Sequence, residues 1–245
     1  MSGTRLLEVA NKHNFALPAF NISDWAMCQG IFEICEAKGA PFIVAIHPDE
    51  LQHTGVDLLP AIIQRAHRSS VPTSIHLDHG TTQQQILLAI QTGFTSVMFD
   101  GSMLPFDENV AATRRAAEAA HAVGLTVEGE LGTIGTTESG TQYAEANIVY
   151  TDPDDAVRFV AETGVDSLAI AIGTCHGIYP SWMKPELKLG TCCARSRRRS
   201  TSRWCCTAAR ATRTTRSPSR CGGGSTRSIS RATSRCPTTR RCARC

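Results

Sequence analysis

The chain has 245 residues, with 25 Lys and Arg against 22 Asp and Glu and 42% hydrophobic residues, a composition typical of a soluble globular protein. The uncharged apolar runs are all shorter than the roughly 18 residues that a transmembrane helix needs, so we predict no membrane span. Residues 1–8 hold no apolar stretch of signal-peptide length, so secretion is not expected.

This average composition combines two unlike parts. Residues 1–190 carry 10 Lys and Arg and all 22 acidic residues, whereas residues 191–245 carry 15 Arg, no Lys and no acidic residue. Eight of the 11 cysteines also fall in residues 191–245. We therefore treat residues 1–190 as one domain and residues 191–245 as a separate tail rich in Arg, Ser, Thr and Cys.

Short apolar runs recur through residues 1–190, and their starts lie 23 to 41 residues apart. Each run is rich in Val, Ile, Phe or Leu, as is typical of strands that are buried on both faces. We predict six strands, over Phe15–Ile22, Phe42–His47, Thr73–His79, Ser96–Asp100, Thr126–Leu131 and Ser167–Gly173.

Helical patterns lie between these runs. After the first run, Ser23 is expected to cap a helix that Gly39 ends. The face of this helix that we expect in the core carries Met27, Ile31, Ile34 and Cys35. A further helix is expected over the alanine-rich residues 106–123, before Gly124.

Alternating strands and helices imply a parallel sheet with right-handed crossovers. Six such units match the beginning of a (β/α)8 barrel, which needs about 250 residues. The rival architecture, an open doubly wound sheet, usually carries a glycine fingerprint after its first strand. Here the first strand ends in Ala19-Phe20-Asn21-Ile22 without such glycines, so the barrel is favoured.

Polar residues stand near the ends of these strands. In a barrel, the C-terminal ends of the strands form the active site, so we expect these side chains to converge. They are Asn21, His47, His76, Asp78, His79, Asp100, Glu128, Glu130 and His176.

This set of residue types favours metal-assisted chemistry beside a carbonyl. His79 and His176 can bind a divalent metal through neutral imidazole, and zinc is usual for sets of His and carboxylate ligands. Asp78 and His79 are adjacent in sequence, and in a regular strand adjacent side chains point to opposite faces of the sheet. At the end of a strand this alternation is less strict. A metal that polarises a carbonyl and a carboxylate that moves a proton suit enolate formation or aldol cleavage.

Structural roles are the alternative for several of these residues. Asp100 precedes Gly101-Ser102 and can be read as a turn residue only. Cys175 can be read as a nucleophile, but the sequence places no base beside it. We assign structural roles to His47, His53, His67 and His121.

Five segments of residues 4–190 resemble the class II, zinc-dependent ketose-bisphosphate aldolases, in the order and spacing of that family. The most similar branch is that of the fructose- and tagatose-bisphosphate aldolases. The segments are Ala19-Phe20-Asn21, residues 75–80, residues 96–102, residues 127–132 and residues 171–177. The resemblance implies a lyase of carbohydrate metabolism and glycolysis on a (β/α)8 TIM barrel, cytoplasmic and homo-oligomeric.

The resemblance also assigns the metal and the base. His79 and His176 match two of the three histidines that hold the catalytic Zn²⁺. Asp78 matches the aspartate that takes the proton from the C4 hydroxyl of the ketose bisphosphate. Asp100 and Glu130 match carboxylates on which the metal rests in an alternative position.

Three further residues match positions that handle substrate in the family. Asn21 matches an asparagine that contacts the substrate, and Gly177 matches a glycine at the substrate phosphate. Glu138 lies in the loop where the family keeps an acidic residue for proton return.

The tail departs from this pattern completely. The family continues with two strands, one that ends in His-Gly-Gly-Ser and supplies the third zinc histidine, and one with Asn-Ile-Ser-Ser that binds phosphate. Residues 191–245 contain neither motif and no Leu, Val, Phe, Met or His, so we expect disorder there. About six β/α units are thus present, and a non-homologous tail replaces the last two.

A change of reading frame near Gly190 accounts for the tail. Moving each codon one base earlier permits Ser202–Ala208 to read Ile-Pro-Leu-Val-Leu-His-Gly, a strand leading to a histidine. The same shift permits Gly224–Ser234 to read as a strand that contains Asn-Ile-Ser-Ser. We therefore predict that the tail is out of frame, in the gene or in its recorded sequence.

Three functions follow from this sequence. The first is a zinc-dependent aldolase that reversibly cleaves a ketose 1,6-bisphosphate, fructose or tagatose, to dihydroxyacetone phosphate and glyceraldehyde 3-phosphate. The second is a truncated and catalytically inactive product of a frameshifted aldolase gene. The third is a nucleic-acid-binding protein with a basic tail, but that tail nearly lacks aromatic residues, so we expect no nucleic-acid partner.

Overall fold

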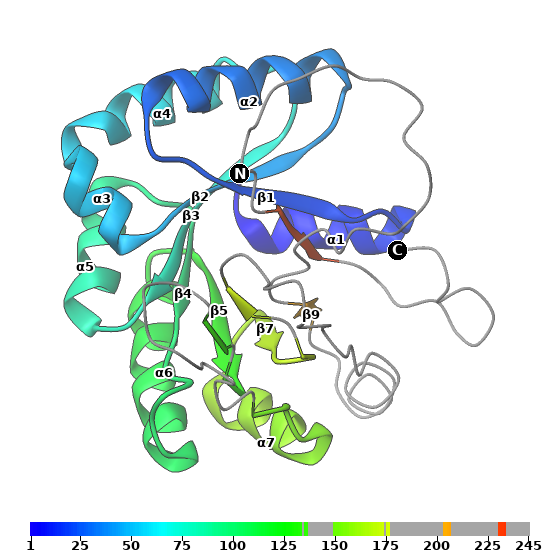
Figure 1. The fold of residues 1–245 in the computed structure, drawn as a ribbon, viewed down its shortest axis with the longest axis vertical. Helices are drawn as coiled ribbons and strands as arrows, with labels where there is room; N and C mark the ends of the chain where they lie inside the picture. The colour runs from blue at the N-terminus through cyan, green and yellow to red at the C-terminus, as the bar shows by residue number, and fades with distance from the viewer. Residues whose placement is uncertain (134, 137–148, 174, 177–202, 207–229, 234–245) are drawn as a thin grey trace.

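A computed structural model describes residues 1–133, 135–136, 149–173, 175–176, 203–206 and 230–233 (Figure 1). The helices are α1 (Gly3–His13), α2 (Trp25–Ala37), α3 (Pro48–Thr54), the 3-10 turn η1 (Val56–Leu58), α4 (Leu59–His67), α5 (Gln83–Thr92), α6 (Phe106–His121) and α7 (Pro153–Thr163). The strands are β1 (Leu17–Asn21), β2 (Phe42–Ile46), β3 (Thr73–Gly80), β4 (Ser96–Phe99), β5 (Thr126–Leu131), β6 (Gly135–Thr136), β7 (Ser167–Ile170), β8 (Cys175–His176), β9 (Arg203–Cys206) and β10 (Ser230–Thr233).

The six predicted strands are β1, β2, β3, β4, β5 and β7, and each pairs in parallel with the next. Helices come after each of the strands β1 to β5 and cover the outside of that part of the sheet (Figure 1). The sheet closes into a barrel in the order β1-β10-β9-β7-β5-β4-β3-β2. This confirms the prediction of a barrel over an open doubly wound sheet.

Two short strands from the tail complete the barrel. Strand β9 runs parallel to β7, whereas β10 runs antiparallel to both β9 and β1. The antiparallel strand departs from a regular (β/α)8 barrel, in which all strands are parallel. The composition predicts disorder for the tail, but strand pairing uses backbone groups that every non-proline residue carries. The two strands lie within the segments that the shifted frame reads as strands, and the frame change itself stays a prediction.

Helix α2 begins one residue later than predicted. Asp24, and not Ser23, is its N-cap, because the Asp24 carboxylate accepts a hydrogen bond of 2.7 Å from the Met27 N–H. The predicted end is confirmed, since the helix stops at Ala37 and Gly39 follows with a φ of +60°.

The buried face of α2 is also shifted from the predicted one. Cys28, Phe32 and Cys35 are buried, whereas Met27 and Ile34 are exposed, Ile34 by 60%. Apolar residues occupy two adjacent stripes of this helix, so spacing alone does not select one. Phe32 decides the rotation, because its ring packs edge-on against Phe42 of β2 with centroids 4.9 Å apart.

Helix α1 covers the N-terminal end of the barrel strands. The Thr4 N–H donates to the Thr126 hydroxyl at 2.8 Å, and the amino group of Met1 donates to the Thr73 carbonyl at 3.0 Å. Thr73 and Thr126 are the first residues of β3 and β5, so the opposite ends of these strands remain for a functional site. A small apolar cluster joins α1 to β1 and β2, and it comprises Leu6, Leu7, Ala10, Leu17, Ala19 and Ile43.

Among the described helices, none has the length and apolar character that crossing a membrane requires.

Candidate metal centre

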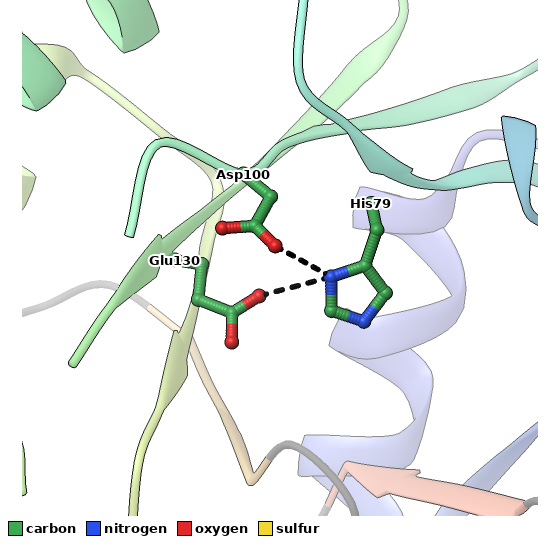
Figure 2. Close-up of side chains that lie close together, drawn as sticks. All are labelled: His79, Asp100 and Glu130. Carbon is green, nitrogen blue, oxygen red and sulfur yellow. Dashed lines mark hydrogen bonds and ion pairs between the residues drawn. The ribbon is translucent and has the colours of Figure 1, made fainter. Parts of the chain in front are cut away.

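Three side chains from neighbouring strands meet at the C-terminal end of the barrel (Figure 2). His79 lies near the end of β3, Asp100 directly follows β4, and Glu130 lies near the end of β5. His79 Nδ1 is 2.7 Å from Asp100 Oδ2 and 3.3 Å from Glu130 Oε2. One potential ligand atom from each residue lies within 4.8 Å of the others. The three predicted residues therefore form one compact cluster of donors.

The backbone of β3 turns His79 toward the two carboxylates. The register between β3 and β4 shifts between Leu77 and Gly80, and His79 has a φ of +53°. The left-handed region costs a residue with a side chain about 1–2 kcal/mol. This departure from regular strand geometry lets Asp78 and His79 act at the same end of the barrel, as expected for a strand end.

Asp100 is both a turn residue and a member of the cluster. Its Oδ1 accepts hydrogen bonds from the Ser102 N–H at 3.0 Å and the Ser102 hydroxyl at 2.6 Å, while Oδ2 faces His79. Burial alone would raise the pKa of Asp100. The hydrogen bond and charge of His79, together with the Ser102 donors, outweigh burial and lower this pKa to about 2. Asp100 is therefore an anion across the physiological pH range.

The backbone of Glu130 is held by a residue that sequence reasoning missed. The Asn109 amide of α6 donates to the Glu130 carbonyl at 2.9 Å and accepts from the Thr113 hydroxyl at 2.9 Å. Asn109 and Thr113 are buried. The only available signal was a pair of polar residues spaced by four within an alanine-rich helix, which is equally typical of a solvated face.

Asn21 and Asp78 also meet, at the ends of β1 and β3. The Asn21 amide Nδ2 donates to Asp78 Oδ2 at 3.0 Å. Asp78 is 3% exposed, so its carboxylate is held in a fixed orientation and largely shielded from water. The structure thus places Asn21, Asp78, His79, Asp100 and Glu130 at one end of the barrel.

The remaining predicted residues fall partly or wholly outside the described residues. His176 lies in β8, whose backbone pairs in parallel with β6 opposite Thr136, but its side chain is not among the described ones. Glu138 and Gly177 lie outside the described residues.

His76 of β3 and Glu128 of β5 lie deeper in the barrel than the cluster, because they precede Asp78 and Glu130 by two residues on the same strands. His76 Nδ1 is 2.8 Å from Ser96 Oγ, and His76 Nε2 is 3.8 Å from Glu128 Oε2. Both side chains are at most 10% exposed. Glu128 and Glu130 are both buried, and His76 and Glu128 pair inside the barrel.

The donors of the cluster fit a zinc ion. Histidine nitrogen and carboxylate oxygen are ligands that Zn²⁺ accepts, and here they converge from three rigid strands. A metal bound among the three residues would take the lone pair of Nδ1. A metal bound at the other ring nitrogen would leave Asp100 to orient the imidazole, as carboxylates do for ligating histidines.

Comparison with known proteins places these features in a family. The sequence model of the family of class II fructose-bisphosphate aldolases matches residues 1–193. A fructose-bisphosphate aldolase of Thermus caldophilus is 38% identical over 185 residues, which are 76% of this chain and 61% of the relative. One of Giardia intestinalis is 38% identical over 187 residues, which are 76% of this chain and 57% of the relative. The chain therefore spans about three fifths of the length of these curated relatives.

A solved structure gives the same answer for the fold. The YdjI aldolase from Escherichia coli K12 aligns with a TM-score of 0.70 and 29% identity, over 82% of this chain and 69% of that chain. The matched family model covers well over half of the chain, including every residue of the cluster. On these grounds the chain belongs to the class II fructose-bisphosphate aldolase family.

Proposed function

We propose that this chain is a zinc-dependent aldolase that reversibly cleaves a ketose 1,6-bisphosphate, fructose or tagatose, to dihydroxyacetone phosphate and glyceraldehyde 3-phosphate. The observation that carries the proposal is the convergence of an imidazole and two carboxylates beside a buried, oriented aspartate, in the matched part of the family. We further propose a cytoplasmic homo-oligomer whose partner is a sugar bisphosphate, with no nucleic-acid or membrane partner.

In this proposal His79, Asp100 and Glu130 hold the zinc ion, with His176 as a further ligand. When bound, zinc supplies an electrophile that polarises the ketose carbonyl and offsets the negative charge that develops there. The chain contributes the anionic Asp100, which balances the charge of the ion, and the backbone geometry that directs His79 into the cluster.

Asp78 is the base. Its carboxylate takes the proton of the C4 hydroxyl, the C3–C4 bond breaks, and the aldehyde phosphate leaves. The electron pair of that bond remains on the dihydroxyacetone phosphate half as an enediolate. Asn21 holds Asp78 Oδ2 and so orients the carboxylate. We assign Glu138 to return a proton to C3 and Gly177 to bind phosphate.

The test is cleavage of both ketose bisphosphates by the zinc-loaded chain, with triose phosphate release coupled to NADH oxidation. Asp78→Asn keeps an oxygen that accepts from Asn21 but removes the base, so we expect kcat to fall by about 10²–10⁴-fold. Asp166→Asn is the matched control, because Asp166 contacts His121 at the start of β7, at the other end of the barrel strands. Its activity should equal that of the unmodified chain, and a chelator should abolish cleavage.

The second candidate function is an inactive product of a frameshifted gene. It is favoured by the tail, whose residues 191–245 hold no histidine and neither of the two motifs with which the family continues. The same assay separates the two candidates. Cleavage of neither sugar above the Asp78→Asn background would establish the inactive product.

A further inference from the structure

A second imidazole lies at the rim of the metal cluster. His47 directly follows β2, the strand beside β3, and its ring centroid is 5.9 Å from that of His79, with the rings tilted by 52°. The His47 side chain is 36% exposed, against 14% for His79. His47 therefore lies on the solvent side of the cluster, where a ligand bound at His79 would enter.

The hydrogen bonds of His47 determine where its proton is. Nδ1 accepts from the Asp49 N–H at 3.2 Å and so caps α3. A ring nitrogen that accepts carries no proton, so the neutral ring holds its proton on Nε2. The Asp49 carboxylate is 3.5 Å from the same Nδ1, but it is 87% exposed, so water screens its charge. Within the described part of the chain, no hydrogen bond uses His47 Nε2.

A sugar phosphate bound beside the Asp100 and Glu130 carboxylates requires a hydrogen-bond donor such as the His47 Nε2–H. Asp100 and Glu130 contribute two carboxylates, which accept hydrogen bonds and repel electron-rich oxygens. A ketose phosphate presents hydroxyl and phosphate oxygens, and these require N–H or O–H groups. His47 lies beside His79, and its Nδ1 accepts a backbone hydrogen bond at the start of α3. The proton of the neutral ring is therefore on Nε2, which points away from that backbone group.

We propose that His47 is a substrate-binding residue, which donates its Nε2–H to a hydroxyl or phosphate oxygen of the ketose phosphate seated at His79. The inference rests on the proposed aldolase function and adds a residue to it. The structural role that the sequence predicts for His47 is real, since it caps α3, and that same bond prepares the ring as a donor.

The capping role and the binding role can be separated by substitution. His47→Asn retains a good N-cap acceptor but is too short to present the Nε2–H, whereas His47→Ala removes both functions. His53→Asn, on the exposed side of the same helix, is the matched control. Each variant is loaded with zinc, and equilibrium binding of dihydroxyacetone phosphate and of unphosphorylated dihydroxyacetone is measured by calorimetry.

We expect His47→Asn to unfold at the temperature of the unmodified chain, to retain its zinc affinity, and to bind dihydroxyacetone phosphate about 10-fold more weakly. Weakening for the phosphorylated ligand alone assigns the contact to phosphate, and weakening for both assigns it to a hydroxyl. His53→Asn should bind as the unmodified chain does.

Three results would overturn the proposal. If His47→Asn binds normally, His47 only caps α3, whether or not His47→Ala is impaired. If His47→Asn also loses zinc, His47 is a metal ligand and not a substrate contact. If the unmodified zinc-loaded chain binds neither compound, the proposed function itself fails, and the role of His47 fails with it.

Discussion

Replacing Asp100 by Asn should weaken zinc binding without unfolding the chain. The Asn side chain has the same shape, and its single oxygen can still accept from Ser102, but its amide nitrogen then faces His79 and it carries no charge. Asp100 is 2.7 Å from His79 and only 16% exposed, so its charge acts on the cluster with little screening by water. The substitution therefore removes one of the two anions that offset a divalent cation at this position.

The pKa of Asp100 shows how strongly its neighbours favour the anion. A fall from the ordinary 3.8 to about 2 means that its neighbours stabilise the anion by about 2 kcal/mol net of burial. His79 and Ser102 supply that stabilisation, and a cation in the cluster would add to it. Loss of a carboxylate that hydrogen-bonds a ligating histidine, as Asp100 does to His79, typically costs 10–100-fold in metal affinity, or about 1.4–2.7 kcal/mol.

The assay is competition for zinc between the purified chain and a chromophoric chelator at pH 7. Asp166→Asn is again the control, because its carboxylate lies 2.9 Å from His121 in a pair of the same chemistry away from the cluster. We expect a 10–100-fold weaker Kd for Asp100→Asn and an unchanged Kd for Asp166→Asn. If Asp100→Asn and the unmodified chain bind zinc with equal affinity, within twofold, then the charge of Asp100 does not contribute to zinc binding.

Two predictions concern stability. Arg65 donates to both oxygens of Glu36, at 2.8 and 2.7 Å, and these bonds lower the pKa of Glu36 from 4.5 to about 2. Glu36→Gln should therefore lower the free energy of unfolding in urea by about 1–2 kcal/mol at pH 7. Because the folded pKa is depressed, this difference should shrink as the pH falls from 4.5 toward 2, and a difference that stays constant from pH 7 to 3 would contradict the assignment. A Cβ at Gly129 would lie 2.8 Å from the buried Phe159 ring, so Gly129→Ala should destabilise by about 1–3 kcal/mol in thermal unfolding. Gly30→Ala, with nothing within 4 Å of its Cβ, should leave stability unchanged or raise it, and equal effects of the two alanines would count against the packing argument.

The strands could be predicted because their signal is local. A strand buried on both faces reads as a short apolar run, and Thr126–Leu131 was predicted with the bounds that the structure has. Helix α2 was harder, since two apolar stripes overlap on it and the contact of Phe32 with Phe42 joins distant segments. Sequence spacing contains no information about that contact.

The residues of the site could be predicted from the sequence better than the interactions that hold them in place. Carboxylates and imidazoles at strand ends are visible in sequence, and topology brings Asp100 and Glu130 to His79. The positive φ of His79 could not be predicted, because this conformation is uncommon for residues other than glycine and the apolar run predicts a regular strand there. Asn109 was missed for a related reason, since its bond to the Glu130 carbonyl depends on helix packing.

Strand pairing in the tail could not be predicted from composition either. Its composition predicts disorder, and the tail residues that the structure describes, 203–206 and 230–233, pair as β9 with β7 and as β10 with β1. Free edges present unpaired N–H and C=O groups to any extended backbone, so pairing there depends weakly on side chains. Composition measures what a segment can bury and says little about such pairing.

The central claim is that the carboxyl ends of β3, β4 and β5 hold a catalytic zinc ion. The most direct measurement is anomalous X-ray scattering at the zinc absorption edge from crystals of the zinc-loaded chain. We expect one strong peak within about 2.0–2.1 Å of a His79 ring nitrogen and beside the Asp100 and Glu130 carboxylates. A zinc peak elsewhere, with none at His79, would contradict it.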